Sequence, residues 1–204
     1  MNTLKILLGT AAFLVTSFAC ANQEKTFLSM RSDAGDLVGQ GQTYHLTTPK
    51  DGHLVINVDQ NHSNVNFWLD TSGNQPQPLP SWFGNFWTAG KNIPLAIGQY
   101  DNAMSPSTAN SLHPGLAISY GYAHPSSTTG SFHIYDLGFD VYGNVDHLAL
   151  TFEQYSNGST AALHGALWYN SALPLPAVPE PEAYIELLAG LGLLGICFLR
   201  RKPT

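Results

Sequence analysis

Cysteine is almost absent from this chain, and the positions of the two cysteines limit how the protein can be stabilised. They are Cys20, close to the N-terminus, and Cys197, close to the C-terminus of the 204 residues. Residues 22–182 contain none. A domain built from that stretch has to be stable without disulfide bonds, so its hydrophobic core must supply the stability.

Charged residues are also scarce, at 11% of the chain, and basic residues are the rarer kind. Residues 22–182 contain thirteen acidic residues against four basic ones, a net charge of −9. Such a surface repels phosphate groups, which excludes nucleic acid as a partner.

The middle of the chain lacks any long stretch with helical periodicity. Gly, Pro, Asn, Ser and Asp recur every few residues and divide it into short apolar segments, a pattern typical of all-β proteins. We therefore predict one antiparallel β-sandwich or jelly-roll-like domain over residues 22–173. The expected strands cover residues 27–31, 42–47, 53–58, 65–69, 116–120, 130–140, 145–154 and 163–169.

One hairpin is expected between the two longest of these strands. Gly143 and Asn144 supply the positive φ angles that a tight turn requires. In the strand that follows, Leu148, Leu150 and Phe152 share one face and are expected in the core.

The N-terminus reads as an export signal. Residues 6–18 are apolar, and residues 19–21 (Ala-Cys-Ala) form a small-x-small triplet of the kind that signal peptidase cuts after. We interpret residues 1–21 as a signal peptide. Lipidation of Cys20 is the alternative, and the large aromatic residue two positions before it argues against that.

The C-terminal apolar run is short for a membrane span. Residues 183–199, interrupted by Glu186, form a helix of about 26 Å, whereas a bilayer core is about 30 Å thick. The basic tail, residues 200–204, is expected in the cytoplasm and the body on the other side. Upstream, three prolines predict that residues 174–182 are an extended linker.

A Pro-Glu-Pro tripeptide, a short apolar helix and a basic cluster thus follow one another at the C-terminus. The residues of the tripeptide and of the cluster are Pro179, Glu180, Pro181, Arg200, Arg201 and Lys202. Together with a signal peptide, this order resembles the PEP-CTERM sorting signal of Gram-negative bacteria. The resemblance covers about the last 27 residues.

The resemblance implies a partner and a destination. The partner is an exosortase, a membrane-embedded enzyme that reads the segment and removes the tail, and the catalytic residues belong to that enzyme. The protein then passes from an inner-membrane intermediate to the envelope, the outer surface or an exopolysaccharide matrix. The alternative is a plain single-span anchor that stays in the inner membrane.

The body is similar, through short matches, to an uncharacterised β module of secreted bacterial proteins. In those proteins a Cys precedes the Gly-x-Phe strand and another follows Phe-Glu-Gln; here residues 120–129 contain no Cys, and Tyr155 and Ser156 stand at the second place. The resemblance implies no catalytic residue. The matches lie at residues 35–42, 114–116, 130–132, 152–154 and 165–170.

The most unusual segment of the body is LPSWFGNFW, in which four aromatic residues fall within six positions, with Trp68 upstream. Aromatic rings stack on sugar rings, which suits a protein bound for a polysaccharide matrix. The same side chains also fill hydrophobic cores, so both interpretations stay open. The candidate carbohydrate-binding residues are Trp82, Phe83, Phe86 and Trp87.

The sequence predicts no metal site and no cofactor. The eight histidines include no pair at a recognisable zinc-ligand spacing. Calcium is a weaker alternative, because aspartates in loops or at strand ends bind it in many secreted β proteins. The candidates are Asp33, Asp36, Asp70 and Asp101.

The leading functional prediction is an exported, non-enzymatic protein of the surface or exopolysaccharide matrix, with carbohydrate binding as one reading. The alternative is a secreted hydrolase of the glycosidase type, in which two carboxylates act on one bond. On the expected hairpin, the carboxylates available for such a pair are Asp136, Asp140 and Glu153.

Overall fold

The fold is seen in a computed structural model, which describes residues 25–71, 80–89, 93–105 and 112–174. Within these ranges the regular structure consists of ten strands and no helix, so the all-β prediction is confirmed. All ten strands lie in the unit that ends at Ala172. The strands are β1 (Lys25–Ser32), β2 (Thr43–Thr47), β3 (His53–Val58), β4 (Asn64–Asp70), β5 (Trp82–Trp87), β6 (Gly98–Met104), β7 (Gly115–Tyr120), β8 (Thr128–Phe139), β9 (Val145–Ser156) and β10 (Ala162–Ser171).

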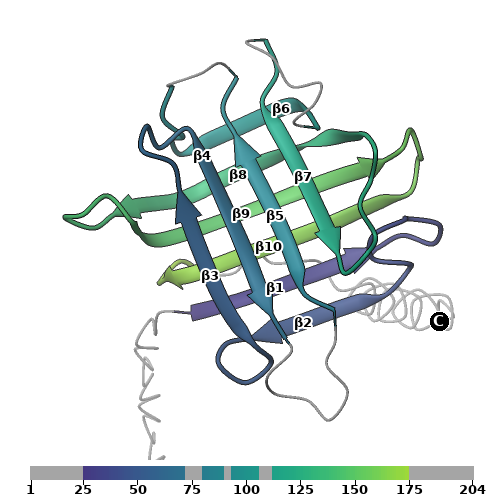
Figure 1. Ribbon diagram of the computed structural model, residues 1–204, viewed down its shortest axis with the longest axis horizontal. Coiled ribbons are helices and arrows are strands. Elements are labelled where there is room, and N and C mark those ends of the chain that lie inside the picture. Colours follow the sequence, from purple (N-terminus) through teal and green to yellow (C-terminus); the bar gives the residue numbers. More distant parts are fainter. Residues whose placement is uncertain (1–24, 72–79, 90–92, 106–111, 175–204) are drawn as a thin grey trace, which may run out of the picture. The chain divides into compact units, whose positions relative to one another are not determined.

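The ten strands form one curled mixed sheet in the order β2-β1-β10-β9-β8-β6-β7-β5-β4-β3. Neighbours are antiparallel except β6 and β7, which meet through one parallel pair, Met104 and Gly115. Around this joint the sheet folds over, and β3, β4, β5 and β7 run across the face of β8, β9 and β10 (Figure 1). We call β3, β4, β5 and β7 the four-strand layer, and the remaining strands the six-strand layer. A single sheet therefore supplies both layers, in place of the two separate sheets of a sandwich.

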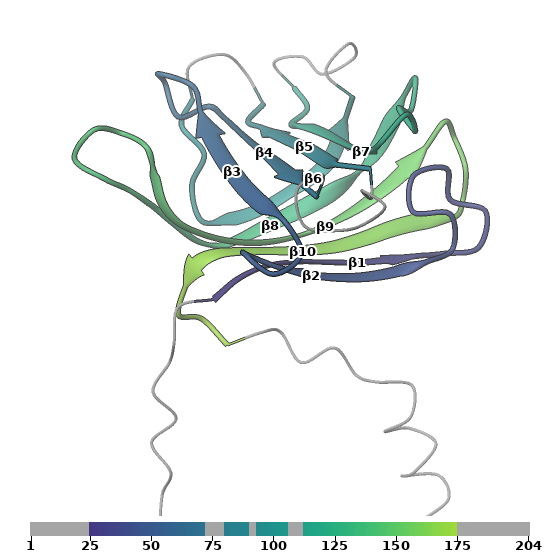
Figure 2. The same ribbon diagram turned by 60° about the horizontal axis from the view of Figure 1, so that its bottom comes forward.

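The hydrophobic core fills the space between the two layers, which face each other in Figure 2. On β9, Leu148, Leu150 and Phe152 point inward and are buried, as their alternation predicts. On β5, Trp82 and Phe86 do the same from the opposite layer, and the rings of Phe86 and Phe152 lie 5.8 Å apart. Large aromatic side chains bury much apolar area, so they contribute stability to a domain without disulfide bonds.

A buried glutamine connects the layers where backbone pairing stops. Past its one contact with β6, β7 has no strand partner on that edge among the described residues. Gln154, on the inner face of β9, accepts a hydrogen bond from the Ile118 N–H (2.7 Å) and donates one to the Ile118 carbonyl (3.0 Å). The Thr128 hydroxyl donates to the Leu116 carbonyl. Side chains thus satisfy backbone groups that would otherwise be buried without partners.

The eight strands predicted from the sequence are all present, with ends that differ by a few residues. Two strands, β5 and β6, were not predicted. The predicted turn between β8 and β9 is present. The prediction of a positive φ is confirmed for Gly143, whose φ is 83°, and is wrong for Asn144. Asn144 instead donates from its backbone N–H (2.9 Å) and its side-chain amide (3.0 Å) to the Asp140 carboxylate.

The predicted terminal elements lie outside the described residues. These are the signal peptide (1–21), the linker beyond Pro174, the transmembrane segment (183–199) and the basic tail (200–204). Over the ranges that the structure describes, no helix is long and apolar enough to cross a membrane. The six sorting residues Pro179, Glu180, Pro181, Arg200, Arg201 and Lys202 therefore keep the status of predictions.

Candidate functional site

Strand alternation divides the aromatic segment of β5 between two faces. Trp82 and Phe86 point into the core and have no exposed surface. Phe83, at 42% exposure, and the half-buried Trp87 point outward. Because a buried ring cannot touch a ligand, sugar stacking by the four predicted residues is limited to Phe83 and Trp87.

A third ring joins them from the neighbouring strand. Trp68 of β4 is 50% exposed and lies directly opposite Phe83 in the β4–β5 register. Trp87 lies four residues further along β5, about 13 Å away at the usual rise of a strand. Its ring lies across Gly115 of β7, where a Cβ atom would come within 2.5 Å of it. The missing Cβ lets the Trp87 ring lie close to the sheet.

A row of asparagines separates the two aromatic positions. Asn57, Asn66 and Asn85 are cross-strand neighbours on β3, β4 and β5. The Asn57 side-chain amide donates to the Asn66 carbonyl oxygen at 3.3 Å. Each amide carries donors and acceptors, which match the hydroxyl groups of a sugar. We call this surface the aromatic–asparagine face, formed by Trp68, Phe83, Trp87, Asn57, Asn66 and Asn85.

The aromatic–asparagine face is nearly free of formal charge. The four strands that carry it contain one charged residue, Asp70, at the end of β4 and opposite His53. Since the residues 22–182 carry a net charge of −9, this neutrality distinguishes the face from the rest of the domain. Its chemistry fits an uncharged ligand with apolar faces and hydroxyl groups.

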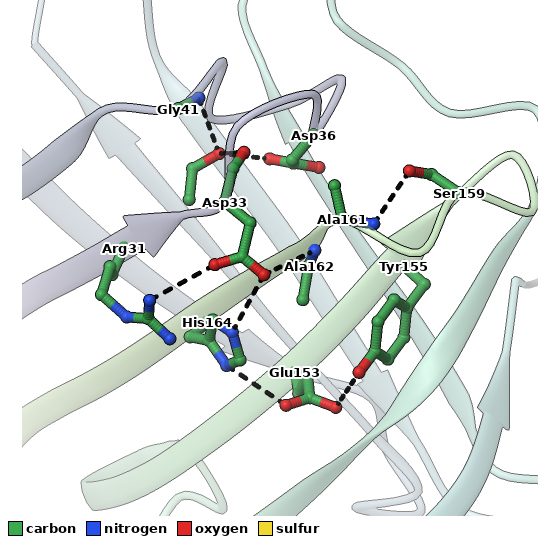
Figure 3. Close-up of polar contacts among 11 residues, drawn as sticks. Arg31, Asp33, Asp36, Gly41, Glu153, Tyr155, Ser159, Ala161, Ala162 and His164 are labelled. Carbon is green, nitrogen blue, oxygen red and sulfur yellow. Dashed lines mark hydrogen bonds and ion pairs between the residues drawn. The ribbon is translucent and has the colours of Figure 1, made fainter.

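The outer side of the six-strand layer carries a polar network instead (Figure 3). Asp33 lies 3.3 Å from Arg31 and 3.7 Å from Nε2 of His164, whose Nδ1 lies 3.2 Å from Glu153. The Tyr155 hydroxyl donates to Glu153 at 2.6 Å, and this bond raises the pKa of the tyrosine. A tyrosine with a raised pKa stays protonated and is no nucleophile at neutral pH. Because the imidazole fills the space between the two carboxylates, no substrate bond fits there.

A hollow of about 740 Å³ adjoins the network at Glu153 and Tyr155. Its two carboxylates already have partners, since Asp101 accepts from Gln99 at 2.9 Å and Glu153 accepts from Tyr155. Neighbouring side chains thus hold both carboxylates in place. Other side chains around it are those of Asn102, Met104, His113, Thr129 and Ser131.

The three carboxylates considered for a glycosidase do not come together. Asp136 is paired in the sheet with Ala149, and Glu153 with Ser131, four residues further along β9. That separation is about 13 Å, beyond the roughly 5–10 Å that glycosidases use. Asp140 is engaged in its own turn, where it accepts from three groups. These three carboxylates therefore form no pair of the glycosidase type.

A serine, a histidine and an aspartate do meet at the other end of β8, in the wrong order for catalysis. The buried Ser171 hydroxyl donates to Asp136 at 2.7 Å, and His147 Nε2 lies 3.3 Å from the same carboxylate. In a catalytic triad the imidazole lies between the hydroxyl and the acid, so that it can take the hydroxyl proton. Here the acid lies in the middle, so the order of the three groups differs from that of a triad.

Two of the four aspartates considered for calcium, Asp33 and Asp36, serve structural roles. Asp36, 3% exposed, accepts from the Ser32 hydroxyl (2.8 Å) and the Gly39 N–H (2.7 Å), which holds the loop after β1. Asp33 belongs to the polar network described above. Over the residues that the structure describes, no three His, Cys, Asp or Glu side chains are grouped as a metal site requires.

No family model, curated protein or solved structure matches this chain. The function therefore has to be argued from the aromatic–asparagine face itself. Sequence reasoning found Phe83 and Trp87 and mentioned Trp68, but missed Asn57, Asn66 and Asn85. Alternation within each strand places these asparagines on the outward face, yet only the cross-strand register aligns them in one row.

Proposed function

We propose that this chain is a non-enzymatic polysaccharide-binding protein of the bacterial surface or exopolysaccharide matrix. The observation that carries the proposal is the aromatic–asparagine face, with three outward rings around a row of amides. Sugar rings have apolar faces that stack on aromatic side chains and hydroxyl groups that bond to amides. Binding sites of this kind combine apolar contact area with a few polar groups that fix orientation.

The proposed ligand is an uncharged polysaccharide that binds along its length. A uronate polymer would meet the net negative charge of the domain and be repelled. Phe83 and Trp87 lie about 13 Å apart on β5, so they would contact different sugar units of one chain. An open sheet surface also accepts the middle of a polymer, whereas a closed pocket would select its end.

Binding is tested by Trp68→Ala, measured by affinity electrophoresis and co-sedimentation with a β-glucan, a mannan and a galactan. Loss of a central aromatic contact costs about 2 kcal/mol, which is roughly 25-fold in affinity. The ring is half exposed, so the fold should survive its removal. The matched control is Tyr142→Ala, which removes an exposed ring (86%) at the β8–β9 turn and should leave binding unchanged. Equal binding by the two variants would contradict the proposal.

Delivery to the surface is the second part of the proposal. The signal peptide (1–21) directs export, the segment 183–199 holds the chain in the inner membrane, and an exosortase cleaves near the Pro-Glu-Pro motif. Its support is the order of these elements in the sequence together with the basic residues that end it. A protein of the extracellular matrix would then reach the polymer that the face is proposed to bind.

Cell fractionation and intact mass test the delivery. The native protein should lack the residues after about Pro181 and be found outside the inner membrane. The double variant Pro179→Ala/Pro181→Ala should accumulate at full length in the inner membrane, while Pro176→Ala in the same linker should be processed normally. A wild-type protein that keeps its tail and stays in the inner membrane would refute the sorting assignment.

A further inference from the structure

The edge strand β3 has a partner on one side only among the described residues. It is the last strand in the sheet order and pairs with β4 along all six of its residues, without a bulge. In Figure 1 it is the outermost strand of its layer. Along its other edge, the described part of the chain places no strand. The backbone groups on that edge can therefore pair with another chain.

β3 also lacks the features that usually protect an edge. Its sequence, HLVINV, contains no proline and no Lys, Arg, Asp or Glu. Proteins commonly blunt exposed edges with charge, proline or a bulge. The opposite edge strand, β2 (TYHLT), is also free of charge and proline, but the Asp51 carboxylate accepts from the Thr47 N–H (2.9 Å) and hydroxyl (3.0 Å) at its end. Among the described residues, no side chain bonds to a backbone group of β3 in this way.

The side chains of β3 are suited to pairing with a second copy of the same strand. Leu54, Ile56 and Val58 point toward the core, and the last two are only partly buried. His53, Val55 and Asn57 point outward. An antiparallel pair that preserves the faces sets apolar residues against apolar residues on the inner side. The strand itself carries no formal charge, so no like charges oppose one another within it.

We propose that two copies of this chain pair antiparallel through β3 and form one continuous sheet. The two-fold symmetric contact requires only that the edge be complementary to itself. Elsewhere the copies repel, because residues 22–182 carry a net charge of −9, and β3 is a stretch without charge. The register centred on Ile56 sets His53 of one copy opposite Asp59 of the other, a favourable pairing, and keeps the two copies' Asp51 and Asp59 apart.

Pairing through β3 would place two aromatic–asparagine faces on the same side of the joined sheet. Val55 lies beside Trp68 in the β3–β4 register, so the two faces would adjoin across the axis. This consequence rests on the proposed function, whereas the pairing itself does not. Two linked sites on one polymer gain about 10²–10⁴ in avidity over a single site when the geometry permits both to bind.

Cysteine cross-linking tests the pairing in the full chain, with Cys20 and Cys197 replaced by serine. Val55→Cys on β3 should give a dimer on a non-reducing gel after treatment with a short thiol-reactive cross-linker. The matched control, Asn66→Cys, lies on the same face one strand further in, which adds about 10 Å between the two thiols. It should stay monomeric. A monomeric Val55→Cys chain, or equal cross-linking at both positions, would overturn the proposal.

A charge variant separates pairing from ligand binding. In detergent solution, Val55→Lys should sediment as a monomer and Asn66→Lys as a dimer, with thermal melts verifying that both are folded. Trp68→Ala should remain a dimer while it loses binding to a β-glucan. A dimer that binds no polysaccharide would support the pairing and refute the proposed function. A dimeric Val55→Lys chain with normal folding would refute the pairing alone.

Discussion

Replacing Gln154 by leucine tests whether a side chain joins the two layers of the sheet. Gln154 is fully buried and is bonded through both ends of its amide to the backbone of Ile118. Leucine has a similar volume, so it leaves little cavity, but it removes the partners of one buried N–H and one buried carbonyl. Each lost partner costs about 1–3 kcal/mol. We expect the free energy of unfolding to fall by about 2–4 kcal/mol.

For a domain of this size the loss lowers Tm by roughly 5–15 °C, which circular dichroism and urea titration can measure. The control is Gln99→Leu, an exposed glutamine on β6 that bonds to Asp101 at 2.9 Å. It should change the stability by less than about 0.5 kcal/mol. If Gln154→Leu unfolds at the wild-type temperature, the two layers do not need the glutamine to join them, which would refute this prediction.

Gln154→Glu gives the same test a pH dependence. A protonated glutamic acid can donate to the Ile118 carbonyl and accept from the Ile118 N–H, whereas the ionised form cannot donate. Burial should raise the folded-state pKa of this acid above its unfolded value of about 4.3. The variant should therefore be most stable relative to wild type below about pH 4 and lose stability as the pH rises through the folded pKa. A constant difference across this range would contradict the assignment.

The remaining predictions concern single polar side chains. Burial acts against ionisation of Asp59, but hydrogen bonds from Ser63 and Asn64 outweigh it and lower its pKa. The stability that the ionised carboxylate contributes is present above the unfolded pKa of about 3.9 and is lost as the pH falls through the folded pKa. Asp59→Asn should thus lower the free energy of unfolding by about 1–2 kcal/mol at pH 7 in urea titrations, and the difference should vanish in acid. The buried Ser156 hydroxyl has no partner among the described residues, so Ser156→Ala should leave Tm unchanged or raise it. Ser171→Ala, which removes the donor to Asp136, should lower Tm.

The sequence predicted most strands because hydrophobic alternation and turn residues are local signals. It missed β5 because WFGNFW reads as an aromatic cluster, although its buried positions are every second residue, Trp82, Gly84 and Phe86. Gly84 interrupts the apolar pattern because the Phe67 ring occupies the place of a Cβ atom. It missed β6 because GQYDNAM is mostly polar and is interrupted by a register shift between Tyr100 and Ala103.

The candidate site was predicted only in part because it depends on pairing between strands. A strand pattern shows that Phe83 and Trp87 share a face. It does not show that Trp68 lies opposite Phe83, or that Asn57, Asn66 and Asn85 align. Local sequence patterns also could not predict the contact that connects the two layers, since Gln154 bonds to a residue 36 positions earlier in the chain. The order of the strands decides which of them lie at the edges of the sheet. The proposed role of β3 therefore also depends on the sheet topology.

The indole N–H signals of the four tryptophans test the central claim most directly. In NMR spectra of protein labelled at tryptophan and titrated with a neutral β-glucan, mannan or galactan, Trp68 and Trp87 should shift with saturation. Trp82 and Trp168, at 0% and 1% exposure, should stay in place. Single Trp→Phe variants assign the four signals. If no polymer moves the signals of Trp68 and Trp87, or if all four shift alike, the aromatic–asparagine face is not the binding site.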